Sequence, residues 1–188
     1  SPVFNSDQGS ILESSSSKDS PDPPSARFSQ NYDGGSALVP GLSFRWGMGS
    51  TFGAEESMYA ATALALRTLM TQRLAFEMAV DYETSFQEQG ASRLGGSLSA
   101  VFFLSTSGIT HPYILAGGGA RDDIQAPSSP VMVNFFGGFG LEFSISTLLR
   151  IGVDCRAYIA VAADRERSSQ GGIVCGTVLS FFPGLSSN

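Results

Sequence analysis

Charged side chains recur at even spacing inside apolar segments of residues 37–183. Glu77 and Asp81, for example, stand four residues apart and alternate with the apolar Phe76, Met78 and Val80. In an extended chain, residues two or four positions apart point to the same side. Opposite charges on one face can form ion pairs, which is how buried charge is tolerated. We therefore predict an ion-pair network made by Arg45, Arg67, Glu77, Asp81, Arg93, Glu142, Asp154 and Arg156, with Glu83 and Arg150 nearer the segment ends.

The sequence offers little else for catalysis or for cofactor binding. His111 is the only histidine, and no recognisable His/Ser hydrolase motif accompanies it. It precedes Pro112 between two apolar segments, so we interpret it as a turn residue. The two cysteines do not make a metal site, which needs more ligands. Gly117-Gly118-Gly119 lacks the strand-to-helix context of a nucleotide loop. These features predict a non-enzymatic protein without a metal or another cofactor.

Composition divides the chain into a polar tail and a longer apolar part. Residues 1–36 contain a serine run at 14–17 and a proline-rich stretch at 21–24, and such a segment cannot bury a core. We expect a disordered or extended tail that can bind an envelope protein. The net charge of -6 and the pI near 4.6 argue against a nucleic-acid binder. No apolar run reaches the roughly 18–20 residues of a membrane-spanning helix.

The apolar part alternates with a period of two, which is typical of β-strands. In residues 73–83 the even-numbered positions are large and apolar, whereas the odd-numbered ones are small or charged. Comparable patterns predict strands near 41–50, 57–69, 73–84, 92–105, 111–121, 130–146, 149–163 and 171–182. The second is rich in alanine and leucine and could be a helix by propensity, but closure of a barrel favours an even number of strands. The glycine-rich pattern of 113–121 does not show which of its residues point to which face of the strand.

The largest side chains lie on the apolar face, and the opposite face carries glycine, serine, alanine and the charges. Phe76, Phe102 and Phe139 belong to the large set. A soluble sandwich would pack such rings inside, whereas a narrow membrane barrel keeps small side chains in its lumen and turns large ones toward lipid. We predict an all-β fold, an eight-stranded antiparallel up-and-down transmembrane β-barrel over residues 37–183, preceded by the tail 1–36 and followed by a short C-terminal tail at 184–188.

Residues 38–182 resemble the OmpA-like family of small outer-membrane β-barrels. The resemblance rests on the number of strands, the inverted alternation, the succession of short and longer connections, and a last strand that ends in Leu179-Ser180-Phe181-Phe182. It implies a place in the bacterial outer membrane, contact with outer-membrane lipid, and both termini in the periplasm.

Hairpin spacing predicts one specific ion pair. Arg67 and Glu77 flank the expected turn at 71–72, so they should be near-opposite neighbours on adjacent strands. We expect a salt bridge between them, extended by Arg45 or Glu142.

Hairpin spacing also relates the two cysteines. Cys155 and Cys175 are about equally far from the centre of the last expected loop, near 165–167, so they should lie about opposite each other. A disulfide between them would persist in an oxidising periplasm. The alternative is two free thiols that serve as small lipid-facing residues.

The function predicted from these features is that of an outer-membrane anchor or interaction subunit of an envelope complex, with a lumen plugged by ion pairs. A path gated by exchange of ion-pair partners is the alternative to a permanent plug. The sequence is also compatible with a transport barrel for small solutes or hydrophobic ligands, with an outer-membrane lipid-modifying enzyme, and with a soluble barrel similar to the lipocalins.

Overall fold

The computed structural model describes residues 38–52, 57–87, 92–124, 131–162 and 169–183. The predicted tails 1–36 and 184–188 lie outside these ranges. No helix within them is long and apolar enough to cross a membrane. The regular elements are the strands β1 (Val39–Phe52), β2 (Met58–Leu69), β3 (Leu74–Ser85), β4 (Ser92–Phe103), β5 (Thr110–Asp123), β6 (Met132–Ser144), β7 (Leu149–Ala162) and β8 (Gln170–Phe181).

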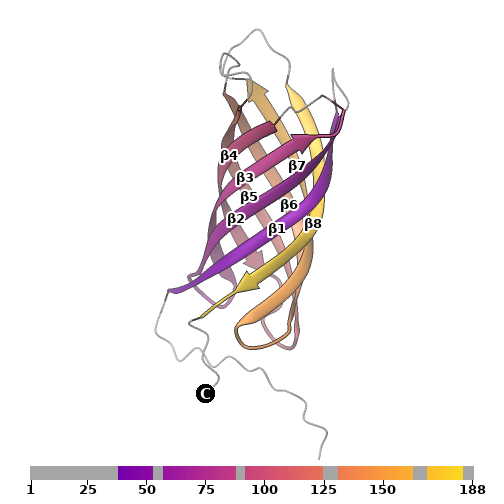
Figure 1. Cartoon of the computed structure of the whole chain (residues 1–188). Helices are drawn as coiled ribbons and strands as arrows, with labels where there is room; N and C mark the ends of the chain where they lie inside the picture. Colours follow the sequence, from indigo (N-terminus) through magenta and orange to yellow (C-terminus); the bar gives the residue numbers. More distant parts are fainter. Residues whose placement is uncertain (1–37, 53–56, 88–91, 125–130, 163–168, 184–188) are drawn as a thin grey trace, which may run out of the picture.

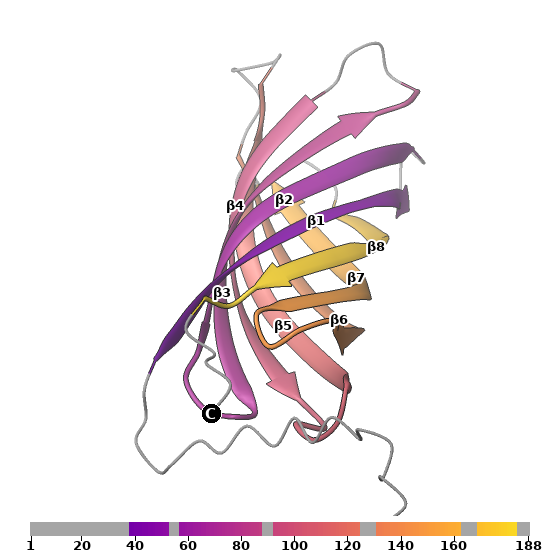
Figure 2. The ribbon, with the colours of Figure 1, turned by 60° about the horizontal axis from the view of Figure 1, so that its bottom comes forward.

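The eight strands form one closed barrel (Figure 1). Each strand pairs antiparallel with the next, and β1 closes the ring by pairing with β8, with Trp46 opposite Thr177. Figure 2 shows this ring obliquely from one end. Closure gives both backbone edges of every strand a partner, which a structure in hydrocarbon requires. The predicted up-and-down barrel is confirmed, and β2 is a strand in spite of its alanine and leucine content.

The barrel has two distinguishable ends. The connections 70–73, 104–109 and 145–148 define the short-turn end, at the bottom of Figure 1, where β1 begins and β8 finishes. The connections 53–57, 86–91, 124–131 and 163–169 define the long-loop end. The difference in length is smaller than expected, since 53–57 is no longer than 104–109. The turn between β4 and β5 contains Gly108 at a φ of 84°, a conformation that glycine adopts without steric cost.

Large apolar side chains cover the outer surface of the barrel. Phe76, Phe102 and Phe139 are 50%, 42% and 67% exposed, and they share this surface with outward leucine, valine, isoleucine and methionine side chains from the same strands. A soluble monomer does not expose a continuous apolar belt of this extent. The inverted alternation is therefore confirmed, and the strands are those of a membrane-spanning barrel.

The inner face departs from the prediction at the short-turn end. We expected small and charged side chains throughout the lumen, but large apolar ones fill this end. We call this cluster the apolar layer; it consists of Val39, Leu69, Ala75, Val101, Phe103, Tyr113, Leu115 and Phe182. The sequence pattern hid it because apolar residues occupy both faces near the strand ends, as in the adjacent pairs Phe102 and Phe103, and Phe181 and Phe182.

Three inward tyrosines fit because a glycine lies opposite each ring. A Cβ atom at any of these glycines would overlap the tyrosine ring across from it. The cross-strand pairs are Gly49 with Tyr59, Gly140 with Tyr113, and Gly172 with Tyr158. These positions explain part of the glycine content of the strands. The lumen is narrow, and a glycine without a Cβ atom leaves room for the ring on the neighbouring strand.

Candidate functional site

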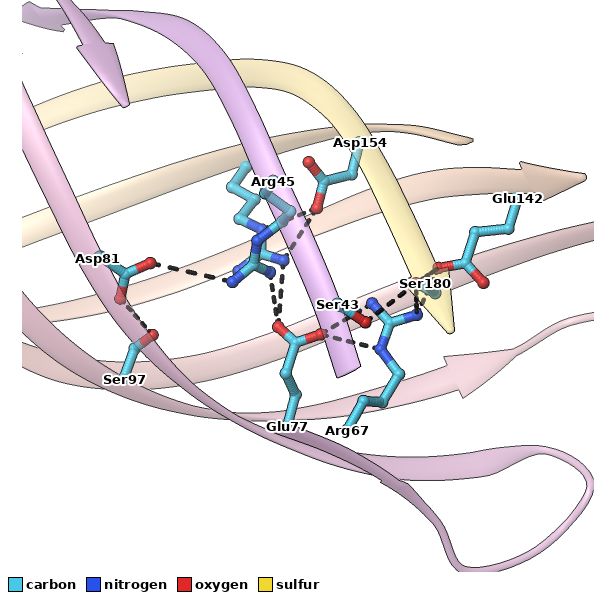
Figure 3. A network of polar contacts seen from close by, with 10 residues as sticks. Ser43, Arg45, Arg67, Glu77, Asp81, Ser97, Glu142, Asp154 and Ser180 are labelled. Atoms are coloured by element: carbon cyan, nitrogen blue, oxygen red, sulfur yellow. Dashed lines mark hydrogen bonds and ion pairs between the residues drawn. The ribbon is translucent and has the colours of Figure 1, made fainter. Parts of the chain in front are cut away.

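An arginine in the half of the lumen toward the short-turn end joins two opposite walls of the barrel. Arg67 on β2 is the direct cross-strand partner of Glu77 on β3. Its Nε donates to Glu77 Oε2 at 2.9 Å, and its Nη2 lies 2.8 Å from the same oxygen. Its Nη1 forms an ion pair with Glu142 of β6, four strands away in the ring of eight (Figure 3). Arg67 and Glu142 are both completely buried.

Glu77 is the hub of the network, because three guanidinium groups converge on its carboxylate. Besides Arg67, Arg45 Nη1 lies 2.5 Å from Oε1, and Arg156 Nη2 lies 3.5 Å from the same oxygen. Arg156 also bonds Asp154, with 2.9 Å between Nη2 and Oδ2. Each charge in this group has an opposite charge beside it, which offsets the cost of removing it from water.

Two further residues extend the network toward the two ends of the lumen. Arg45 Nη2 lies 3.9 Å from Asp81 Oδ1, and Ser97 donates to Asp81 Oδ2 at 2.7 Å. At the other side, Arg150 Nη1 lies 3.9 Å from Glu142 Oε2. We call the connected set the ionic layer; its four arginines and four carboxylates have no net formal charge. The members are Arg45, Arg67, Glu77, Asp81, Glu142, Arg150, Asp154 and Arg156.

Arg93 does not join this network, contrary to the prediction. It lies on β4 near the long-loop end, and no ion pair holds it to a carboxylate of the described strands. Its cross-strand partner on β3 is Glu83, but both oxygens of Glu83 accept from Arg121 Nη1, at 2.9 and 2.7 Å. The carboxylate of Glu83 is bonded by the arginine on β5 instead.

The sequence interpretation missed Arg121. Its guanidinium lies over the ring of Tyr158, 4.4 Å from the ring centroid, close enough for a cation–π contact. With Glu83 and the buried Tyr59 these residues form a second polar cluster nearer the long-loop end, which we call the tyrosine layer. The sequence did contain a sign that Arg121 points inward, since it is an even number of residues from Tyr113 on the same strand and therefore lies on the same face. The glycines between them obscured it.

His111 is not a turn residue, contrary to the prediction. It is the second residue of β5, its side chain is buried in the lumen, and its Nε2 lies 2.9 Å from Ser144 Oγ of β6. The strand begins earlier than the sequence suggested because β5 continues its pairing with β6 as far as Thr110. The His111–Ser144 pair therefore faces the interior at the short-turn end.

The cysteines lie on the outer face. Cys155 and Cys175 are direct partners in the β7–β8 pair, with their Cα atoms 4.1 Å apart, and they are joined by a disulfide. Their outer neighbours in register are Phe139 on one side and Met48 on the other. The bond therefore crosses the last hairpin in the middle of the apolar belt.

Two small cavities lie between the ionic and the tyrosine layers. Each has a volume of about 70 Å³, and both are lined by Asp81, Glu83 and Arg156. A space of this size holds about two water molecules. Among the residues that the structure describes, no group of three or more side chains is placed to hold a metal ion.

No protein-family model and no curated protein matches this sequence. Solved structures match its fold. Neisserial surface protein A has a TM-score of 0.65 at 10% identity, over 76% of this chain and 97% of that chain. The outer membrane enzyme PagL has a TM-score of 0.53 at 17% identity, over 75% of this chain and 98% of that chain. At such identities the likeness shows the fold alone.

Proposed function

We propose that the chain is a closed, non-enzymatic barrel of the bacterial outer membrane that serves as an anchor or interaction subunit of an envelope complex. The observation that carries this proposal is the bond between Arg67 and Glu142, which joins opposite walls of the lumen toward the short-turn end. An eight-stranded barrel has room for little more than its own side chains. These two side chains and the apolar layer fill the lumen of the described strands, which leaves no bore for solutes.

Three features support an outer-membrane location. The apolar belt requires lipid, and a closed strand barrel is the form in which β-structure crosses a membrane. The disulfide between Cys155 and Cys175 suits a chain that folds in an oxidising compartment. The short-turn end, where β1 begins and β8 finishes, is then the periplasmic end, because outer-membrane barrels have their short turns there.

Transport and lipid modification receive less support from the geometry. A transport path would have to pass the ionic layer and the apolar layer, and the two cavities described above lie on the long-loop side of both. A lipid-modifying enzyme needs its reactive groups within reach of a lipid. His111 and Ser144 are bonded inside the lumen, where a lipid has no access.

Conductance tests the closed barrel directly. The full chain, reconstituted into planar bilayers, is expected to give no step conductance above that of protein-free bilayers. Regular steps that scale with salt concentration would favour a transport barrel. Expression in an outer membrane should also leave the masses of lipid A species unchanged, and a shift by one acyl chain would favour an enzyme.

Deletion of the tail tests the interaction role. Removing residues 1–30 should leave insertion of the barrel intact and abolish the stoichiometric co-purification of an envelope protein. A variant with the same thirty residues in scrambled order is the matched control, since it keeps composition and length. An unchanged set of co-purifying proteins in both variants would contradict a binding role for the tail.

A further inference from the structure

The apolar layer fills the β1–β5 side of the lumen near the short-turn end, where it lies beside Glu142 and Arg150 of the ionic layer. Its side chains come from β1 to β5 and from Phe182, which follows β8. Phe103 and Tyr113 meet edge to face, with ring centroids 5.8 Å apart. On β6 the place of a side chain is taken by Gly140, over which the Tyr113 ring lies. All members are almost completely buried, and Arg150 of β7 closes the remaining side by lying over the rings of Phe103 and Phe182.

The apolar layer offers nothing to a hydrated ion. The hydroxyl of Tyr113 is the only polar side-chain atom among its members. Arg150, near the start of β7, lies over the rings of Phe103 and Phe182 at 5.7 and 5.1 Å from their centroids. An ion that entered from the short-turn end would meet this positive charge together with rings that cannot replace its lost water. Such apolar constrictions exclude ions and water.

The ionic layer differs in this respect. Glu77 has three guanidinium groups within 2.5 to 3.5 Å, so an exchange of partners leaves it paired. Charged side chains can also substitute for the water that an ion loses. A layer of this kind slows an ion, but it supplies ligands along the way.

Solvent access declines from the long-loop end toward the middle of the lumen. The side chain of Asp81 is 33% exposed and that of Glu77 is 1% exposed. The two cavities described above lie on the same side of the ionic layer, where Ser97 and Arg93 line one of them. Water therefore reaches the upper half of the lumen and stops near Glu77.

We infer that the permeability barrier of this barrel is the apolar layer rather than the ion pairs, and that the lumen above it is a blind vestibule open to the long-loop end. This inference rests on the proposed closed barrel and names the element that closes it. The ion pairs then have a different role, which is to hold the strands and side chains in place around the vestibule.

The test compares three forms of the full chain in planar bilayers. The first removes two rings of the apolar layer, Phe103→Ala with Phe182→Ala. The second removes one ion pair without leaving a lone charge, Arg67→Met with Glu142→Gln. The third is a matched control, Phe102→Ala with Phe181→Ala. It changes the same residue type one position away on the lipid face, where these rings are 42% exposed, against 1% and 0% for the inner pair.

The first form is expected to conduct ions at about ten times the background of the native chain or more, because the apolar constriction is opened. The second form and the control are expected to stay at background. Conductance in the second form, or its absence in a folded first form, would overturn the inference. Conductance of the native chain would overturn the proposed closed barrel itself, so the two failures are distinguishable.

A labelling experiment keeps the inference testable if the first form does not fold. In a Cys155→Ser, Cys175→Ser background, Ser97→Cys should react with a charged, water-soluble thiol reagent, since Ser97 lines a cavity of the vestibule. Ala75→Cys, inside the apolar layer, should react only after unfolding in detergent. Equal labelling of both positions in the folded barrel, or no labelling of either, would contradict the vestibule and its barrier.

Discussion

The ring of Tyr113 lies over Gly140, its direct partner in the β5–β6 pair, and a Cβ atom at that glycine would overlap the ring. Gly140→Ala should therefore push Tyr113 out of its place and lower the free energy of unfolding by about 1–3 kcal/mol, as overpacking does in other cores. Urea unfolding of the barrel in lipid vesicles measures this.

The same strand provides the control. Gly137 faces outward, and a Cβ atom there would come no closer than 3.8 Å to a neighbour. Gly137→Ala should leave the unfolding midpoint unchanged. Equal effects of the two substitutions would mean that the ring does not depend on the missing Cβ atom.

Removal of Arg67 should be among the most damaging single changes in the lumen. Arg67→Met leaves Glu142 with the more distant Arg150 as its ion-pair partner and takes one partner from Glu77. Breaking a buried ion pair on one side costs about 3–5 kcal/mol. Arg93→Met is the matched control, since no ion pair of the described strands holds Arg93, and it should change stability by less than about 0.5 kcal/mol. Similar losses for both variants in the same unfolding assay would argue against the network.

The free-energy cost of placing an arginine in the apolar belt should depend on its depth in the bilayer. Phe139 lies near the middle of β6, so Phe139→Arg is expected to cost about 2–4 kcal/mol, and Phe143→Arg, near the short-turn end, only about 0–1 kcal/mol. The yield of heat-modifiable, folded barrel in vesicles and its unfolding free energy report both effects. Equal costs at the two positions would place them at equal depth or outside lipid.

The disulfide should be present in protein isolated from the periplasmic folding pathway. Cys155 and Cys175 are direct partners separated by 20 residues in the chain. Closing a loop of that size contributes at most about 3 kcal/mol, and less where strand pairing already restrains the hairpin. Intact mass under non-reducing conditions should be two hydrogens below that of the dithiol form. Alkylation of both cysteines without reductant would show free thiols.

Much of the fold could be predicted from local pattern. A strand alternates its side chains strictly, so the order of residues in a run such as 73–83 is enough to show which of them share a face. A tight turn then fixes what lies opposite, which is why Arg67 and Glu77 could be expected as neighbours and are partners in the register. Both inferences need only the geometry of one strand or one hairpin.

The contacts across the lumen could not be predicted in this way. Glu83 is bonded by Arg121, two strands away on β5, and not by Arg93, its direct partner on β4. The spacing of charges along one strand does not show which of these two side chains reaches the carboxylate. The apolar layer was missed for a related reason. A large inward residue such as Leu69 or Phe103 has the same sequence signature as an outward one when its neighbours are also apolar.

Phenylalanines occur in adjacent pairs at 102–103, 135–136 and 181–182, and these pairs affect how specifically each strand is held in register. If one of these strands slipped by a single residue, one ring of the doublet would take the position of the other and each face would still carry a ring, so the doublets discriminate poorly between the two registers. The same slip on β2 or β6 would carry Arg67 or Glu142 into hydrocarbon. The few charged side chains therefore specify the strand register, which the abundant aromatic side chains leave ambiguous. An interior redesigned without them could keep its volume and still lose a unique alignment.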